Sequence, residues 1–152
     1  MQRLREMMTR SAQVAALMAG AGLLPQAAYA NWSKEAFDAK TLADAVKGLG
    51  GSAPALSKDV TITGPDIAEN GAVVPVGAST TLAGVKRLAL MVEKNPNALA
   101  AVFDVSDAVE ANIATRVKMG QSSNVFAVAM MADGKVLYAQ KEIKVTLGGC
   151  GG

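Results

Sequence analysis

The chain has 152 residues, with 15 lysines and arginines, 13 aspartates and glutamates, no histidine and one cysteine. The lack of histidine excludes Ser-His-Asp and Cys-His catalysis and the usual zinc sites built with imidazole. One cysteine cannot form a disulfide within the chain. A nucleic-acid-binding surface needs clustered basic residues, usually with aromatics, and after residue 30 only Lys86 and Arg87 stand next to each other. We therefore expect no nucleic-acid partner.

Residues 1–30 have the layout of a secretory signal peptide. Three arginines in the first ten residues precede a contiguous, alanine-rich apolar run over residues 11–24, and Ala28 and Ala30 supply the small residues of a cleavage site. The run is shorter than the roughly 20 residues that cross a bilayer. It is contiguous, unlike the spaced pattern of an amphipathic first helix in the folded domain. We expect export, cleavage after about Ala30 and no membrane attachment afterwards.

The predicted cleavage changes the charge of the chain. Cutting after residue 30 of 152 leaves 122 residues, a length that suits one domain with a single core. It removes three arginines and one glutamate, which leaves 12 basic and 12 acidic residues, so the formal charge falls from +2 to zero. The leader has no adjacent Arg-Arg pair. The general secretory pathway therefore fits better than the twin-arginine route.

Two short helices are predicted after the leader. Ser33 can cap a helix over Lys34–Lys40, and Thr41 can cap a second helix through residues 42–46. Three glycines within residues 48–51 then stop the helical pattern.

After Pro54 the hydrophobic period becomes two, which indicates strands. Val125–Met131 is apolar on both faces and is predicted to be a central strand, and Asp133-Gly134 predicts a hairpin turn after it. About seven short strands separated by turn residues predict an all-β fold, an antiparallel immunoglobulin-like β-sandwich over residues 31–147 with a short N-terminal helical segment. The runs predicted to form strands cover residues 60–63, 73–76, 88–92, 99–105, 111–118, 125–131, 135–140 and 143–147.

The segment Pro65–Val76 carries Asp66, Glu69 and Asn70, which suggest a metal or acid-base cluster. Such residues in one turn more often make a capped, hydrogen-bonded turn. We favour the structural role, with Asn70-Gly71 supplying a positive φ, and leave a partner contact open.

The C-terminal sequence Gly148-Gly149-Cys150-Gly151-Gly152 places the only thiol between glycines. Glycine adds no side chain and leaves φ almost unrestricted, so residues 148–152 are predicted to form a thin, flexible arm that reaches roughly 17 Å when extended. The nucleophilic form of cysteine is the thiolate. The nearest basic residue along the chain is Lys144. Activation of the thiol is therefore expected to come from a partner's site.

Three other roles for the tail are compatible with a single C-terminal cysteine. A frayed terminus with an incidental cysteine is disfavoured because an exposed lone thiol in an oxidising compartment is a liability. A thiol-redox enzyme normally has a resolving cysteine, and this chain has none. An immunoglobulin-like interaction module whose Cys150 forms an intermolecular disulfide stays open.

The terminal Val145–Gly152 and the segment Pro65–Val76 resemble the SoxY family of the periplasmic thiosulfate-oxidising system, as do Val92–Pro96 and Asp133-Gly134. The resemblance covers nearly all of the chain after residue 30. The leader departs from the family pattern because it lacks a twin-arginine pair. The resemblance implies a periplasmic sulfur carrier that is not itself an enzyme and binds no cofactor or metal.

The family implies a sequence of partners. SoxZ, a second immunoglobulin-like subunit, forms a heterodimer with the carrier and covers an apolar surface, to which Val125–Met131 is one candidate contributor. The haem-containing SoxXA conjugates thiosulfate to the tail cysteine as an S-thiosulfonate, the metal-dependent hydrolase SoxB releases sulfate, and SoxCD, where present, oxidises the remaining sulfur. Carried over by the resemblance, Cys150 is the covalent attachment point, and the arm consists of Gly148, Gly149, Gly151 and Gly152.

Overall fold

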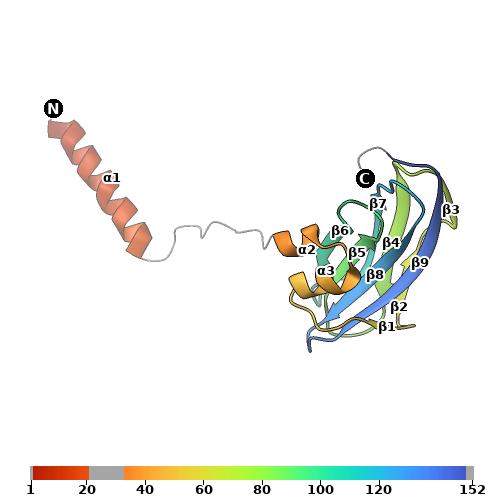
Figure 1. Cartoon of the computed structure of the whole chain (residues 1–152). Coiled ribbons are helices and arrows are strands. Elements are labelled where there is room, and N and C mark those ends of the chain that lie inside the picture. Colours follow the sequence, from red (N-terminus) through yellow and green to blue (C-terminus); the bar gives the residue numbers. More distant parts are fainter. Residues whose placement is uncertain (1, 21–32, 150–152) are drawn as a thin grey trace. The chain divides into compact units, whose positions relative to one another are not determined.

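The computed structural model describes residues 2–20 and 33–149 (Figure 1). The predicted cleavage site at Ala30 and the residues Cys150, Gly151 and Gly152 lie outside the described residues. The chain divides into two units, Met1–Trp32 and Ser33–Gly152. In the first unit, helix α1 spans Gln2–Gly20. Among the described residues, no helix combines the length and apolar character needed to cross a membrane. The signal peptide stays a prediction.

The second unit begins with the two predicted helices, α2 (Lys34–Asp38) and α3 (Leu42–Gly48). Ser33 and Thr41 are their N-caps, as predicted, since each side-chain oxygen accepts a hydrogen bond from a backbone N–H in the first turn. Helix α2 ends two residues earlier than expected. The N-terminal helical segment of the predicted fold is confirmed.

Residues 33–149, the described part of this unit, contain nine strands after the helices, and these strands form two sheets. The larger sheet has the order β1-β9-β8-β5-β6, with β3 also paired to β9, and the smaller has the order β2-β4-β7. The strands are β1 (Ala55–Leu56), β2 (Val60–Thr63), β3 (Ile67–Asn70), β4 (Val74–Thr80), β5 (Val85–Val92), β6 (Leu99–Asp104), β7 (Asn112–Val117), β8 (Ser123–Met131) and β9 (Val136–Leu147).

The larger sheet lies between the smaller sheet and the helices α2 and α3 (Figure 1). Strand β5 shows why: Leu88 and Leu90 face the smaller sheet, whereas Ala89 and Met91 face the helices, and all four are buried. Alternate side chains of one strand therefore belong to two cores. The predicted β-sandwich is confirmed, with the helices as a third layer.

Strand β8 is the central strand that its sequence predicts, because it pairs with β5 on one side and β9 on the other. Met130 packs against the helix-side core and is 8% exposed. Met131 is partly buried against the core between the sheets. The strand is thus a central core strand, as predicted. Its apolar side chains are buried by the chain itself and do not form the partner-covered surface to which Val125–Met131 was a candidate contributor.

The main ladders are antiparallel, as predicted, but β1 and β3 pair with β9 in parallel. Both are short, and neither was predicted. Each is stabilised by the open edge of β9 rather than by a local sequence pattern. The runs predicted over residues 135–140 and 143–147 are one continuous strand, β9, because β8 pairs with its residues 136–143 and β3 with its residues 144–147. Gly134 has a φ of 89°, which confirms the predicted hairpin turn before β9.

The prediction that Asn70-Gly71 supplies a positive φ is wrong. Among the described residues, positive φ occurs only at Gly50, Gly84 and Gly134. Most of the predicted turn around residues 66–70 is strand β3, whose pairing with β9 requires extended backbone.

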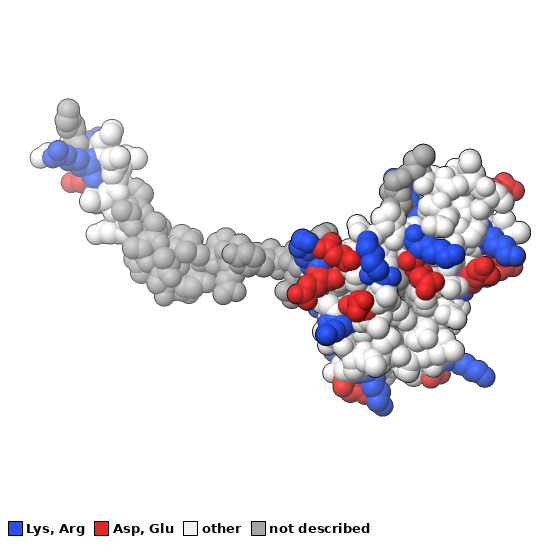
Figure 2. All heavy atoms as spheres, viewed as in Figure 1, with Lys and Arg blue, Asp and Glu red and all other residues white. Residues whose placement is uncertain are grey.

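Charged side chains of both signs are interspersed over the visible face of the second unit (Figure 2). Lys86 is exposed on β5, and its neighbour Arg87 pairs with Asp104 across 3.0 Å. The adjacent basic pair is therefore part of a mixed, solvated surface.

Candidate functional site

Three segments far apart in the sequence meet where β9 ends. Because β3 and β9 are parallel, their carboxyl ends lie at the same edge, and Asn70 is opposite Leu147. Strand β7 ends nearby, since its last residue, Val117, is opposite Val74 at the start of β4. The residues after β3, β7 and β9 are thereby brought together at the point from which the C-terminal segment leaves the domain.

Backbone hydrogen bonds join these segments. The Gly71 N–H donates to the Leu147 carbonyl across 2.7 Å, the Met119 N–H donates to the Gly71 carbonyl across 2.7 Å, and the Gly149 N–H donates to the Met119 carbonyl across 2.9 Å. We call Gly71, Met119, Gly120, Gly148 and Gly149 the glycine clasp. The clasp holds the chain up to the residue before Cys150.

Backbone packing in the clasp leaves no room for a side chain at Gly71, Gly148 or Gly149. A Cβ on Gly148 would overlap the Gly120 carbonyl oxygen, and a Cβ on Gly71 would overlap the Met119 carbonyl oxygen. A Cβ on Gly149 would lie 2.7 Å from the Gly71 oxygen, closer than real Cβ contacts. Gly71 therefore lacks a side chain because of this contact and not because of its φ.

Asn95 braces the loop that carries Met119. Asn95 is only 9% exposed. Its Nδ2 donates a hydrogen bond to the Lys118 carbonyl across 2.6 Å, and its Oδ1 accepts one from the Gly120 N–H across 3.2 Å. Ser122 adds a second tie, because its Oγ accepts from the Val145 N–H across 2.8 Å. The side chains of Asn95 and Ser122 thus supply hydrogen-bond partners to backbone groups that have no partner strand there, since buried polar backbone groups need partners.

The predicted site residues divide into two groups. Gly148 and Gly149 are described and lie in the clasp, whereas Cys150, Gly151 and Gly152 fall outside the described residues. The attachment role of Cys150 and the arm role of the four glycines stay predictions. Sequence reasoning missed Gly71, Asn95 and Gly120, because their partners lie far along the chain.

Asp66 and Asn70, two of the three residues that suggest a metal or acid-base cluster in the sequence, make contacts within the domain. Asp66 Oδ1 lies 2.8 Å from Lys141 Nζ on β9, and this hydrogen bond and charge lower the pKa of the Asp66 carboxyl. Asn70 Oδ1 accepts from the Ala72 N–H across 2.9 Å, and Glu69 is exposed. In the described parts of the chain, no three His, Cys, Asp or Glu side chains are grouped to hold a metal ion.

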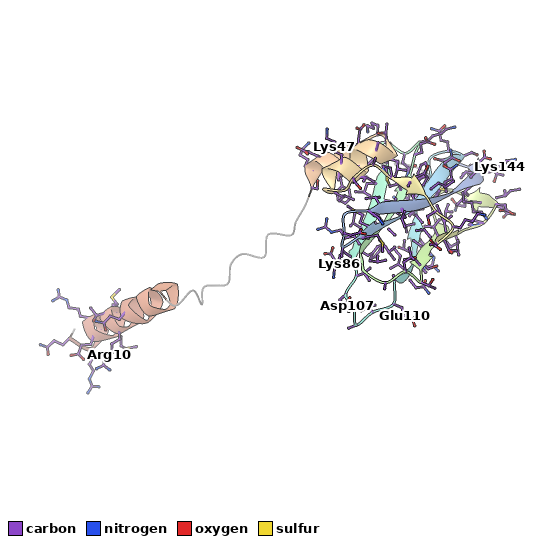
Figure 3. All side chains as sticks on the ribbon, turned by 90° about the horizontal axis from the view of Figure 1, so that it is seen from below. Arg10, Lys47, Lys86, Asp107, Glu110 and Lys144 are labelled. Carbon is purple, nitrogen blue, oxygen red and sulfur yellow. The ribbon has the colours of Figure 1, made fainter. Side chains whose placement is uncertain are left out.

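A pocket of about 780 Å³ lies at the other end of the smaller sheet. Strands β4 and β7 run between the two ends, because Val74 pairs with Val117 beside the clasp and Ser79 pairs with Asn112, which lines the pocket. Figure 3 shows Asp107 and Glu110, two further lining residues, well away from Lys144 on β9. The pocket is therefore separate from the clasp.

Comparisons with known proteins agree with one another. The family described as "Sulfur oxidation protein SoxY" matches residues 46–150, a range that includes the whole clasp and reaches Cys150. The structure of the sulfur carrier protein SoxY from Chlorobium limicola f thiosulfatophilum matches with a TM-score of 0.60 and 30% identity, covering 67% of this chain and 92% of that one. A search of curated proteins found no match.

A superoxide reductase (neelaredoxin) from Ignicoccus hospitalis matches with a TM-score of 0.51 and 18% identity, covering 57% of this chain and 79% of that one. At this identity the likeness concerns the fold alone. The family match over residues 46–150 and the 30% identical SoxY structure confirm the resemblance found in the sequence. This chain belongs to the SoxY family of sulfur oxidation proteins.

Proposed function

We propose that this protein is a periplasmic carrier of sulfur substrates in thiosulfate oxidation, with Cys150 as the covalent attachment point. The observation that carries the proposal is the family match, which ends at Cys150. The Chlorobium relative is named a sulfur carrier protein. The clasp supports it further, since it holds the chain on the domain as far as Gly149, the residue before the proposed attachment point.

The chemistry begins at the thiol. Loss of one proton and two electrons joins Cys150 Sγ to the terminal sulfur of thiosulfate, giving a cysteine S-thiosulfonate, and a haem-containing partner, SoxXA, takes the electrons. Water then cleaves the bond to the sulfonate group in the site of SoxB, which releases sulfate and a proton and leaves a persulfide on Cys150. Where SoxCD is present, it oxidises that outer sulfur. Each step takes place in a partner, so the chain acts as a carrier and not as an enzyme.

The chain's composition suits this division of labour. It has no histidine to serve as a general base near neutral pH. The haem and metal belong to the partners, and this chain carries neither. The carrier works as a heterodimer with SoxZ, and its meetings with SoxXA, SoxB and SoxCD are transient.

Mass spectrometry of the protein purified from the periplasm tests the proposal. We expect a mature N-terminus at Asn31 and sulfur-bearing adducts on the C-terminal peptide. The Cys150→Ser variant should carry no adduct and support no thiosulfate turnover with reconstituted partners, since a serine hydroxyl is not ionised at neutral pH. Its circular dichroism should match that of the wild type.

Other outcomes contradict the proposal. A thiol that stays unmodified during turnover, or turnover by Cys150→Ser, would remove the carrier role. A stable dimer linked through Cys150, seen on a gel without reductant and lacking adducts, would instead indicate an interaction module.

A further inference from the structure

We propose that the glycine clasp fixes the root of the carrier arm, with Gly71 and Asn95 as positioning residues, so that Gly148 and Gly149 stay docked on the domain and the arm begins after Gly149 and not at the end of β9. The identity of the group that the arm carries depends on the proposed function. The docking of Gly148 and Gly149 on the domain is independent of that function.

The first support is the continuous path of hydrogen bonds. Leu147 is bonded to Gly71, Gly71 to Met119, and Met119 to Gly149, each through backbone groups 2.7 to 2.9 Å apart. A flexible arm that began at Gly148 would leave the Met119 carbonyl without this donor. The bond to Gly149 therefore extends the ordered chain two residues past β9.

The second support comes from the domain side of the contact. Gly71 has no positive φ, so its backbone conformation would accept any residue. Three atoms nevertheless crowd the place of its Cβ: the Met119 oxygen, the Gly149 nitrogen at 2.7 Å and Val145 Cγ1 at 2.9 Å. Gly71 thus serves the seating of Gly149, a role outside the arm itself.

The third support is the brace behind the clasp. Asn95 is buried, and both ends of its amide are used on the backbone of residues 118 and 120, one on each side of Met119. This arrangement holds the Met119 carbonyl in place as an acceptor before the arm arrives. A preformed acceptor reduces the ordering that docking requires.

The clasp limits the arm's reach. The thiol belongs to the third residue after β9 but to the first residue after Gly149, so an arm free from Leu147 onward could carry the cysteine Cα roughly 10 Å, whereas a closed clasp keeps it within about 3.8 Å of the Gly149 Cα. A partner's active site must therefore come up to the clasp itself, or the clasp must open. Because two residues are already ordered, entry into a partner's site does not have to order them.

Two glycine-to-alanine variants separate the clasp from a general effect of an added methyl group. In Gly71→Ala the new Cβ collides with clasp backbone. In Gly120→Ala, the matched control, the nearest atom to the new Cβ is the Gly149 oxygen at 4.0 Å. Both residues lie in the clasp, and neither has a positive φ.

The readout is hydrogen exchange of the Gly149 amide in the full purified protein. We expect protection in the wild type, a fall of about tenfold or more in Gly71→Ala, and little change in Gly120→Ala. A nitroxide on Cys150, the only cysteine, should become more mobile in Gly71→Ala alone. The KM for a partner enzyme should rise in Gly71→Ala, while the reaction of the thiol with a small reagent stays the same.

An unprotected Gly149 amide in the wild type overturns the proposal even if Gly71→Ala fails to fold. Equal protection in the wild type and Gly71→Ala also overturns it. Exchange at Gly149 reports the clasp, whereas turnover by Cys150→Ser reports the carrier role, so failure of one is distinguishable from failure of the other.

Discussion

The Gly149 N–H donates a hydrogen bond to the Met119 carbonyl oxygen across 2.9 Å. This bond ties the C-terminal segment to the loop that follows β7. Strand β7 belongs to the smaller sheet, whereas the C-terminal segment continues from β9 in the larger sheet. The root of the arm is thus held by both sheets. Changes in the loop are expected to alter the arm without altering its sequence.

Asn95→Ala should lower the free energy of unfolding by about 1–3 kcal/mol, because the backbone groups of residues 118 and 120 would lose their buried partners. Urea denaturation followed by circular dichroism measures the loss. Asn97→Ala, in the same turn but exposed, is the control and should change little. Equal losses in both variants would show that the turn, and not the brace, matters.

Leu90→Ala should lower the free energy of unfolding by about 2–5 kcal/mol, because this side chain is fully buried between the sheets and its removal leaves a cavity. Leu56→Ala makes the same chemical change at a residue that is 67% exposed. The control should cost much less. A small loss at Leu90 would mean that the two sheets do not share one core.

The Asp66–Lys141 pair predicts a local response to acid. The folded pKa of Asp66 is below its ordinary value, first through the hydrogen bond from Lys141 and then through its charge. The pair's contribution is therefore present above the unfolded pKa and is lost as the pH falls through the lower folded value, that is, below about pH 4. The carboxyl is exposed, so the overall urea midpoint should not move measurably.

The sensitive probe of that pair is the Lys144 amide, which donates to the Asp66 carbonyl across 3.0 Å and joins β3 to β9. Its protection factor should fall below about pH 4 in the wild type. In Asp66→Asn and Lys141→Gln it should vary less over the same range. The same acid response in both variants would refute a role for the pair.

Gly151→Val should slow turnover on every partner enzyme by about tenfold to a hundredfold if the arm threads narrow sites, because a small misplacement of reacting groups is costly. The reaction of the thiol with a small reagent should be nearly unchanged. Gly149→Val should slow turnover too, but its Cβ would also meet Gly71 within the same chain. Only Gly149→Val is expected to disturb the Met119 loop.

The pair of valine variants therefore separates two steric roles. Equal losses in turnover and in small-reagent reactivity would mean that the glycines tune the sulfur itself. Full activity in both assays would mean that the frame around Cys150 is dispensable.

Sequence patterns predicted the elements whose signals are local. The caps at Ser33 and Thr41 depend on residues three positions away, and the alternation at Leu88 and Leu90 reflects the strand's own period. Strand β1 was missed because two residues show no period, and β3 because Asp66 and Asn70 are residue types typical of turns. Both strands are fixed by the edge of β9.

The clasp shows why part of the site could not be predicted. A glycine can serve a positive φ or a close approach, and the sequence around Gly71 does not distinguish them. The deciding atoms belong to Met119 and Gly149, far along the chain. Asn95 stands in an Asn-Pro-Asn run that is typical of a turn, and nothing in that run indicates that its bonds reach residues 23 and 25 positions away. Cys150 could be singled out from sequence alone because a lone cysteine among glycines is itself a local signal.

Strand β9 pairs with β8 along one edge and with β1 and β3 along the other, although it is the last of the nine strands to be synthesised. Until β9 emerges, β1 and β3 have no strand to pair with and β8 is paired only with β5, so the larger sheet cannot be completed until residue 147 has been synthesised. A product that stops before β9 leaves exposed apolar surface and unpaired edges, which proteases recognise. The strand that completes the domain is also the one that leads into Cys150, so a chain truncated before β9 lacks both a complete larger sheet and the cysteine.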